Sequence, residues 1–217
     1  MGVKYINPFS DLTGMYNDWD QLNTLPEIDT LIDIGVGDIG TPELYERFNK
    51  AKLILIDPLI ECNSYIQENL LHRDQCFINS ALGLSPGVLP LNIFSTPGLS
   101  TFLKVSDINF TDKPIEKREV AIDLLDNVIV NKKNLGSIGI KIDTEGYELD
   151  VIKGSPKTLS NTKFVLAEVR HNHESLHGVY KLHEFILEMF KNKFVLTKIF
   201  TAKPFIADLC FQPIEDL

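Results

Sequence analysis

The sequence predicts an α/β protein built on a doubly wound, mostly parallel β-sheet. Short apolar runs alternate with amphipathic segments along the chain, a pattern typical of strands joined by crossover helices. A glycine-rich turn, GVGDIG, separates the first apolar run from the first amphipathic segment. Near the C-terminus a short Lys–Pro loop joins two apolar runs, so we expect an antiparallel hairpin to close the sheet.

The first elements follow from where apolar runs begin and are interrupted. The run TLIDIGV is stopped by glycines within a few residues, which favours a buried strand over a helix. The segment after it has a threonine suited to capping, a proline at the first helical position, and Leu44, Tyr45 and Phe48 on one face. In chain order we expect a strand at Thr30–Val36, a helix at Thr41–Ala51, a strand at Lys52–Asp57, a helix at Glu61–His72, and strands at Cys76–Leu82 and Val88–Phe94.

The later elements complete the same alternation. A mixed apolar and acidic segment reads as a short strand that leads into a helix, and a later helix carries Leu182, Phe185, Ile186 and Met189 on one face. We expect the strand and helix within Val120–Val130, a strand at Ile138–Asp143, a helix at Glu148–Lys153 ended by Gly154, a strand at Lys163–Arg170, a helix at Lys181–Lys191, and hairpin strands at Phe194–Phe200 and Phe205–Phe211.

These elements define one domain at 30–217, which the length of 217 residues also favours. A stretch around 84–119, rich in small and polar residues, reads as an insertion. The segment 1–29 carries Tyr16 and Trp19, which would suit an aromatic lid over an acceptor. The alternative is that this segment docks against the edge of the sheet.

Composition limits the classes of partner. Lys plus Arg is 21 and Asp plus Glu is 30, a formal charge of −9. This acid excess disfavours nucleic acid and anionic membrane surfaces. No basic leader with an apolar stretch begins the chain, and no apolar run is long enough to span a bilayer. Cys62, Cys76 and Cys210 form no disulfide or metal pattern, so we expect a protein of a reducing compartment, the cytoplasm.

In a doubly wound sheet, ligands bind beyond the carboxyl ends of the strands. The first strand carries Asp33 and runs into a G-x-G-x-x-G turn, in which Gly35 and Gly37 allow close approach to the backbone and Asp38 adds a carboxylate. A tight turn that binds nothing is the simpler alternative. We take these four residues as candidate cofactor ligands.

The next two strands end in further polar residues. Asp57 and Pro58 follow the second strand, at about the spacing where an acid binds ribose hydroxyls. Asn79, Ser80 and Ala81 follow the third, where they suit a purine edge or a simple turn. Two adenosine cofactors fit this set, a nicotinamide dinucleotide and S-adenosylmethionine. The carboxylate of Asp38 would repel a pyrophosphate but suits a sulfonium or amino group, which favours S-adenosylmethionine.

The fourth strand leads into the most specific motif. The segment KIDTEGYELDVIKGS resembles the signature of the FkbM-type methyltransferases, roughly K-I-D-x-E-G-x-E-x-x-V-L-x-G. The resemblance continues at LIDIGVGDIGTPELY, ILIDP, SALG, Leu125-Asp126 and FVLAEV, and covers most of 30–170. The chain departs from the family in having Asp57 where Glu is more frequent, and in a first turn longer than the common D-x-G-A-N-x-G.

The resemblance implies a class I, Rossmann-like methyltransferase that uses S-adenosylmethionine. It further implies an O-methyltransferase that acts on a sugar hydroxyl of a glycan or natural product, so we expect a small-molecule or glycan acceptor. Two other functions stay open at this point. One is an NAD(P)-dependent oxidoreductase, and the other is a non-catalytic adenosyl-binding protein.

A hydroxyl acceptor needs a base, because it is a poor nucleophile at neutral pH. Asp143 and Glu145 are candidates; alternatively Glu145 holds the cofactor's amino group while Asp143 orients the acceptor, the division we prefer. His171 is our first choice as base and His173 the second, because imidazole titrates near neutrality. The alternative is a polar loop that happens to hold histidines. A divalent metal bound by Asp143, Glu168 and one of these histidines is the least favoured option.

Overall fold

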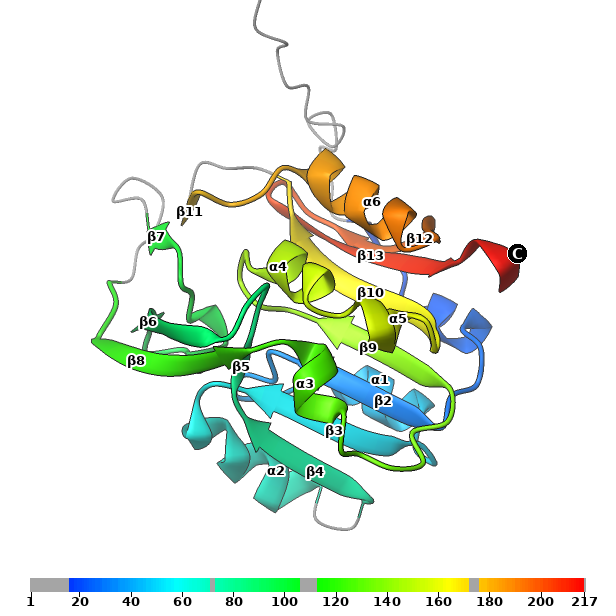
Figure 1. The fold of residues 1–217 in the computed structure, drawn as a ribbon, viewed down its shortest axis with the longest axis horizontal. Coiled ribbons are helices and arrows are strands. Elements are labelled where there is room, and N and C mark those ends of the chain that lie inside the picture. The colour runs from blue at the N-terminus through cyan, green and yellow to red at the C-terminus, as the bar shows by residue number, and fades with distance from the viewer. Residues whose placement is uncertain (1–15, 71–72, 106–112, 172–175, 217) are drawn as a thin grey trace, which may run out of the picture.

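The computed structural model describes residues 16–70, 73–105, 113–171 and 176–216. Its main sheet has eight strands (Figure 1). In spatial order they are β1 (Tyr16–Asn17), β12 (Phe194–Ala202), β13 (Ile206–Pro213), β10 (Thr162–Arg170), β9 (Ile138–Ile142), β2 (Thr30–Ile34), β3 (Lys52–Asp57) and β4 (Gln75–Asn79). Strands β10, β9, β2, β3 and β4 are parallel, whereas β13 pairs antiparallel with both β10 and β12. The predicted doubly wound sheet and its C-terminal hairpin are confirmed.

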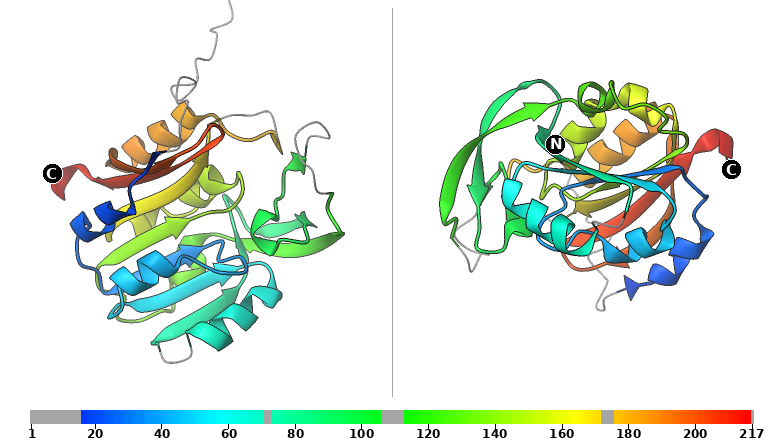
Figure 2. Two further views of the ribbon diagram at one scale, coloured as in Figure 1. Left: turned by 180° about the vertical axis from the view of Figure 1, so that it is seen from behind. Right: turned by 90° about the horizontal axis from the view of Figure 1, so that it is seen from below.

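Helices cover both faces of this sheet because the strands are apolar on both sides. The helices are α1 (Pro42–Arg47), α2 (Asn63–Asn69), α3 (Leu125–Ile129), α4 (Glu148–Lys153), α5 (Pro156–Leu159) and α6 (Leu182–Lys191). One core packs the sheet against α3, α4, α5 and α6, and a second packs it against α1, α2 and the turn Trp19–Thr24 (Figures 1 and 2). In the described part of the chain, no helix combines the length and apolar character that crossing a membrane requires.

A smaller sheet stands beyond the carboxyl ends of β2, β3 and β9 (Figures 1 and 2). It consists of β5 (Ala81–Leu82), β8 (Glu116–Asp123) and β6 (Gly87–Ile93). Nearby, β7 (Lys104–Val105) pairs with β11 (Leu176–His177). A third apolar cluster joins this sheet to Leu59 and Cys62, which follow β3. The small sheet therefore closes the end of the main sheet where a ligand is expected.

Two expectations need revision or extension. The single predicted strand Cys76–Leu82 is wrong, because Ser80 turns the chain: its N–H donates to the carbonyls of Ile78 and Asp57, and Ala81–Leu82 then join the small sheet. Of the N-terminal segment, residues 16–19 lie at the outer edge of the main sheet, where β1 pairs with β12 and the ring of Trp19 packs on Phe200 at 5.4 Å. Residues 1–15 lie outside the described part, so the acceptor lid stays a prediction.

Candidate active site

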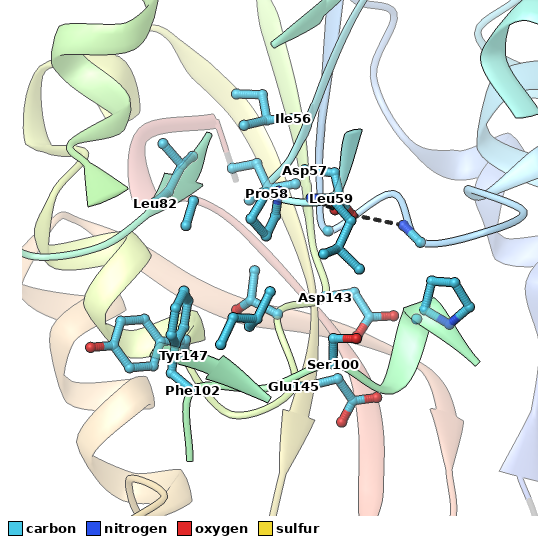
Figure 3. Close-up of a pocket in the computed structure, with 18 of the residues that line it drawn as sticks. Ile56, Asp57, Pro58, Leu59, Leu82, Ser100, Phe102, Asp143, Glu145 and Tyr147 are labelled. Carbon is cyan, nitrogen blue, oxygen red and sulfur yellow. Dashed lines mark hydrogen bonds between the residues drawn. The ribbon is translucent and has the colours of Figure 1, made fainter. Parts of the chain in front are cut away.

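A pocket opens where the main and small sheets meet (Figure 3). Its floor comes from the carboxyl ends of β2, β3 and β9, and its roof from β5, β6 and the loop 97–102. That loop is tied to the floor, because the Thr101 hydroxyl donates to the carbonyl of Glu145 at 2.7 Å. The pocket is thus formed by segments far apart in the sequence and held together by direct contacts.

Two glycines let the floor and the roof approach each other. Gly35 has φ +83°, and a Cβ there would lie 1.7 Å from the carbonyl oxygen of Asp143. Gly37 has φ +59°, and its Cβ would lie 3.1 Å from the Cα of Gly98 in the roof loop. A side chain at either position would be strained by the left-handed backbone and would push neighbouring backbone away.

Asp57 ends β3 and holds the glycine turn in place. Its two carboxylate oxygens accept hydrogen bonds from the N–H of Gly37 at 3.0 Å and the N–H of Leu59 at 2.8 Å. Burial raises the pKa of Asp57, although these backbone donors act in the opposite direction. Each carboxylate oxygen has a second lone pair, so Asp57 can still accept hydrogen bonds from a ligand in the pocket.

One end of the pocket, which we call the apolar half, is lined by Ile56, Leu82, Leu91, Phe102 and Tyr147. The rings of Phe102 and Tyr147 are tilted against each other with centroids 5.0 Å apart. Figure 3 shows these two rings on one side of the pocket and the carboxylates of Asp143 and Glu145 on the other. Such a slot suits a flat, weakly polar ring system.

The turn after β9 carries the opposite end of the pocket. Glu145 has φ +51°, a conformation that few residues other than glycine adopt. The turn is held by Glu148, whose Oε1 accepts the N–H groups of Thr144 at 2.9 Å and Gly146 at 3.0 Å. The other oxygen of Glu148 accepts the Tyr180 hydroxyl at 2.7 Å. Buried hydrogen bonds to one carboxylate therefore fix where Asp143 and Glu145 point.

Three carboxylates, those of Asp143, Glu145 and Glu168, converge at this end of the pocket. Together with two neighbouring cations, Lys141 and Arg170, they form what we call the charged half. The carboxylate oxygens of Asp143, Glu145 and Glu168 all lie within 4.8 Å of one another. The ammonium of Lys141 lies 3.5 Å from Asp143, and the guanidinium of Arg170 donates to Glu145. Lys141 and Arg170 extend from β9 and β10 beneath the carboxylates, so the strands themselves bring the opposite charges together.

Burial perturbs the charged half strongly. Burial raises the pKa of Glu168 to about 8, and the nearby Asp143 carboxylate adds to that shift. Burial lowers the pKa of Lys141, but the carboxylates around it more than offset this, so the pKa is raised overall and Lys141 stays charged. Glu168 is therefore a carboxyl group that holds a proton at neutral pH and can lose it when the local charge changes.

Most of the predicted cofactor ligands come together here. Those that line the pocket are Gly35, Gly37, Asp57, Pro58, Ser80, Ala81, Asp143 and Glu145. They come from β2, β3, β5 and β9, and their convergence follows from the parallel order of these strands.

Three predicted ligands lie outside the lining. Asp33 points to the other face of β2, where it is 1% exposed and accepts the hydroxyl of Tyr45. Asp38 is exposed in the glycine turn. Asn79 uses its amide to donate to the backbone carbonyls of Asp57 and Pro58, at 3.1 and 2.9 Å. None of these three residues is among those that line the pocket.

The predicted histidine base is not placed in the pocket. His171 is fully buried, its ring Nε2 lies 2.9 Å from the carbonyl oxygen of Lys203, and its backbone N–H donates to the carbonyl of Phe205. It thus packs against the loop that joins β12 and β13. His173 lies outside the described residues. The metal option is weakened too, since His171 is engaged elsewhere and Lys141 and Arg170 already supply positive charge to the carboxylates.

Several residues of the site could not be identified from the sequence. Phe102 belongs to an irregular loop, and nothing in its local pattern indicates that it faces a ligand. Lys141 and Arg170 stand inside strands, so their partners depend on cross-strand register. Glu148 stands within the quoted motif, and its position after a glycine turn was the available signal.

The pocket fits an adenosine compound that carries a positive charge. The apolar half matches an adenine ring, Asp57 between the halves matches a ribose diol, and the acidic charged half matches a sulfonium or amino group. A pyrophosphate fits poorly, because the charged half carries more carboxylates than cations.

Comparisons with known proteins agree with this fit. The model of the FkbM methyltransferase domain matches residues 33–196. The solved structure of methyltransferase FkbM from Methylobacillus flagellatus is similar, with a TM-score of 0.50 and 14% identity over 88% of this chain and 47% of that protein. This chain thus spans about half of that protein's length. A fibrillarin pre-rRNA processing protein from Methanococcus jannaschii shares the fold, with a TM-score of 0.50 and 8% identity over 94% and 72%. None of the curated proteins compared with the chain matches it.

Proposed function

The chain belongs to the FkbM methyltransferase family, and we propose that it transfers the methyl group of S-adenosylmethionine to a hydroxyl oxygen of a carbohydrate, in a glycan or a sugar-bearing natural product. The protein is an S-adenosylmethionine-dependent methyltransferase. The choice of a hydroxyl acceptor is supported by one observation above all, the carboxylates of the charged half at the end of the pocket opposite the apolar slot.

Different residues of the pocket bind different parts of the cofactor. Phe102 and Tyr147 hold the adenine, Asp57 accepts hydrogen bonds from the ribose hydroxyls, and Gly35 and Gly37 let the methionine tail lie against the backbone. The cofactor supplies a methyl group already activated by the positive sulfur. What the protein adds is mainly alignment, which accounts for much of the acceleration in such displacements.

The charged half then prepares the acceptor. Glu145 is neutralised by Arg170, whereas Asp143 is partly exposed and faces the pocket, so Asp143 orients the acceptor hydroxyl. Sugar hydroxyls pair well with carboxylates, because a carboxylate accepts two hydrogen bonds side by side. Three free cysteines fit a reducing compartment, and the charge of −9 is unfavourable for a nucleic acid acceptor, so we place the reaction in the cytoplasm on a small molecule or glycan.

The proposal is tested by methyl transfer from radiolabelled S-adenosylmethionine to a panel of acceptors. The panel contains free sugars, methyl glycosides and oligosaccharides, with a lysine peptide and a fatty acid as amine and carboxylate controls. We expect label in at least one carbohydrate, as a methyl ether that resists alkaline hydrolysis. Label only in the amine or as an alkali-labile ester would contradict the proposal, and cofactor binding without any transfer would favour a non-catalytic protein.

A further inference from the structure

The geometry points to Glu168 as the carboxyl group that gives up its proton when the positively charged cofactor binds and that accepts the hydroxyl proton of the acceptor during methyl transfer. This inference rests on the function proposed above, because a hydroxyl acceptor must lose its proton to a group of the protein. It names a base other than the buried His171 and the ion-paired carboxylates.

Glu168 differs from its two acidic neighbours in its partners. Arg170 is paired with Glu145, and Lys141 lies 3.5 Å from Asp143. Among the described residues, no Lys or Arg comes within ion-pairing distance of the Glu168 carboxylate. Its oxygen nevertheless lies within 4.8 Å of oxygens of both neighbours, which line the pocket. Glu168 is thus the carboxylate of the three that is free to change its proton.

The order of the strands places Glu168 at the reacting end of the pocket. Running across the sheet from β4 through β3, β2 and β9, the pocket passes from the apolar half to Asp57, the glycine turn and Asp143. Glu168, on the neighbouring strand β10, lies behind this end, with a carboxylate oxygen within 4.8 Å of oxygens of Asp143 and Glu145. A cofactor whose ribose lies at Asp57 and whose adenine fills the apolar half extends its sulfur towards β9 and β10. The acceptor then approaches from the side of Glu168.

The surroundings of Glu168 explain why it holds a proton without a ligand. In the antiparallel register Glu168 faces Asp208, which accepts the hydroxyl of Thr201 and lies 3.6 Å from Lys141. Burial and these negative neighbours raise the pKa of Glu168 to about 8. The charged groups that act on it are Asp143 and Lys141 from β9, Asp208 from β13 and Glu148 from α4, with Glu145 in the adjoining turn and Arg170 on its own strand.

A cation in the pocket reverses this balance. A positive charge about 6 Å away lowers the pKa of a carboxyl group by about two units at an effective dielectric constant of about 20. Glu168 would change from mostly protonated to mostly ionised at pH 7, which releases about 0.8 proton. S-adenosylhomocysteine has the same adenosine and amino acid groups without the sulfonium, so its binding leaves that proton in place.

The ionised Glu168 then completes the transfer. A lone pair of the acceptor oxygen forms the new bond to the methyl carbon, and the methyl–sulfur bond breaks with its electron pair left on sulfur. The hydroxyl proton passes to Glu168. The positive charge of the sulfonium and the negative charge of Glu168 disappear together, so no net charge is left buried at the end of the step.

Calorimetric titration measures this proton exchange without an acceptor. Binding of S-adenosylmethionine and of S-adenosylhomocysteine is recorded at pH 7 in two buffers of different ionisation enthalpy, which gives the protons released. We expect the wild-type protein to release about 0.8 proton more with S-adenosylmethionine. Glu168→Gln should reduce the difference below about 0.2 proton. Glu119→Gln, on the exposed side of β8, is the control and should match the wild type.

Two results would overturn the inference. The first is a Glu168→Gln variant that releases as many protons as the wild type. The variant must also bind S-adenosylhomocysteine with an affinity within about twofold of the wild type, which shows that its cofactor site is intact. The second is a proton release that is lost in Asp143→Asn but retained in Glu168→Gln, because this would assign the released proton to Asp143.

A second measurement needs no variant. In the wild-type protein, the affinity for S-adenosylmethionine relative to S-adenosylhomocysteine should rise up to about sixfold per pH unit between about pH 6 and 8, and level off above. A ratio that stays constant over this range would contradict the role of Glu168. These outcomes concern cofactor binding, so they are separate from failure of the acceptor screen, which bears on the proposed function alone.

Discussion

The apolar half and the charged half of the pocket differ in how their residues are held. The apolar half is assembled from loops and the small sheet, and its side chains contact one another through van der Waals packing. The charged half stands on adjacent strands of the main sheet, and its two cations, Lys141 and Arg170, each pair with a carboxylate. The effects of substitutions on the free energy of unfolding should therefore be closer to additive in the apolar half than in the charged half, where they should be strongly coupled.

The largest effect is expected at Gly35, where the two halves meet. Gly35→Ala should lower the free energy of unfolding by about 4 kcal/mol, because the new Cβ overlaps the Asp143 carbonyl and the residue has a positive φ. Chemical denaturation measures this. Gly87→Ala is the matched control, since a Cβ there meets nothing within 4 Å, and it should change stability by less than about 0.5 kcal/mol. Equal effects of the two substitutions would show that the close approach at Gly35 does not exist.

Coupling in the charged half is tested at Lys141. Lys141→Met leaves the buried Asp208 and the partly exposed Asp143 without their cation and should cost about 3–4 kcal/mol of stability. Asp208→Asn added to Lys141→Met should restore part of that loss, because it removes one of the uncompensated charges. If the two substitutions are simply additive in urea unfolding, Lys141 and Asp208 do not form the network described here.

Asp33, which is buried close to Lys141, should make the stability of the protein depend on pH. Burial raises the pKa of Asp33 to about 6 from the ordinary value of 3.8, although the Tyr45 hydroxyl opposes the shift. Its contribution to stability is therefore complete below about pH 4 and is lost as the pH rises through about 6, by up to about 3 kcal/mol. Asp33→Asn should remove this part of the pH dependence, while Asp20→Asn on the surface keeps it. A variant at position 33 that unfolds with the same pH profile as the wild type would refute the shift.

A smaller effect is expected where the apolar half meets Asp57. Asp57→Ala should weaken binding of S-adenosylhomocysteine about 30-fold, which corresponds to about 2 kcal/mol for hydrogen bonds to a charged group. Asp57→Asn keeps one acceptor and should lose less. Asp123→Ala, at the end of β8 and outside the pocket lining, is the control and should bind normally in the same titration. If Asp57→Ala bound S-adenosylhomocysteine with wild-type affinity, Asp57 would not be the residue that binds the ribose hydroxyls.

The comparison also explains what could be predicted from the sequence. Strands and the turns after them depend on local patterns, so Lys52–Asp57 and the KIDTEG turn were predicted correctly in place. The run Cys76–Leu82 was misread, because the turn at Ser80 leaves the apolar pattern unbroken. The family prediction, which rested on the motifs, is confirmed by the family match.

Side-chain partners were harder to predict. Asp33 was assigned to the pocket because it stands just before the glycine turn, but the alternation of side chains turns it to the opposite face. The contribution of Phe102 and the contact between His171 and Lys203 depend on segments distant in sequence. The pairing of Arg170 with Glu145 needs the register of β9 against β10, which a single sequence does not reveal.

A crystal structure with S-adenosylhomocysteine bound would show directly whether the cofactor runs from the apolar half to the charged half. We expect adenine between Phe102, Tyr147 and Leu82, ribose hydroxyls on Asp57, and the sulfur nearer to Asp143 and Glu168 than to Leu82. Adenine at the carboxylates, or a cofactor bound away from Asp57, would contradict it.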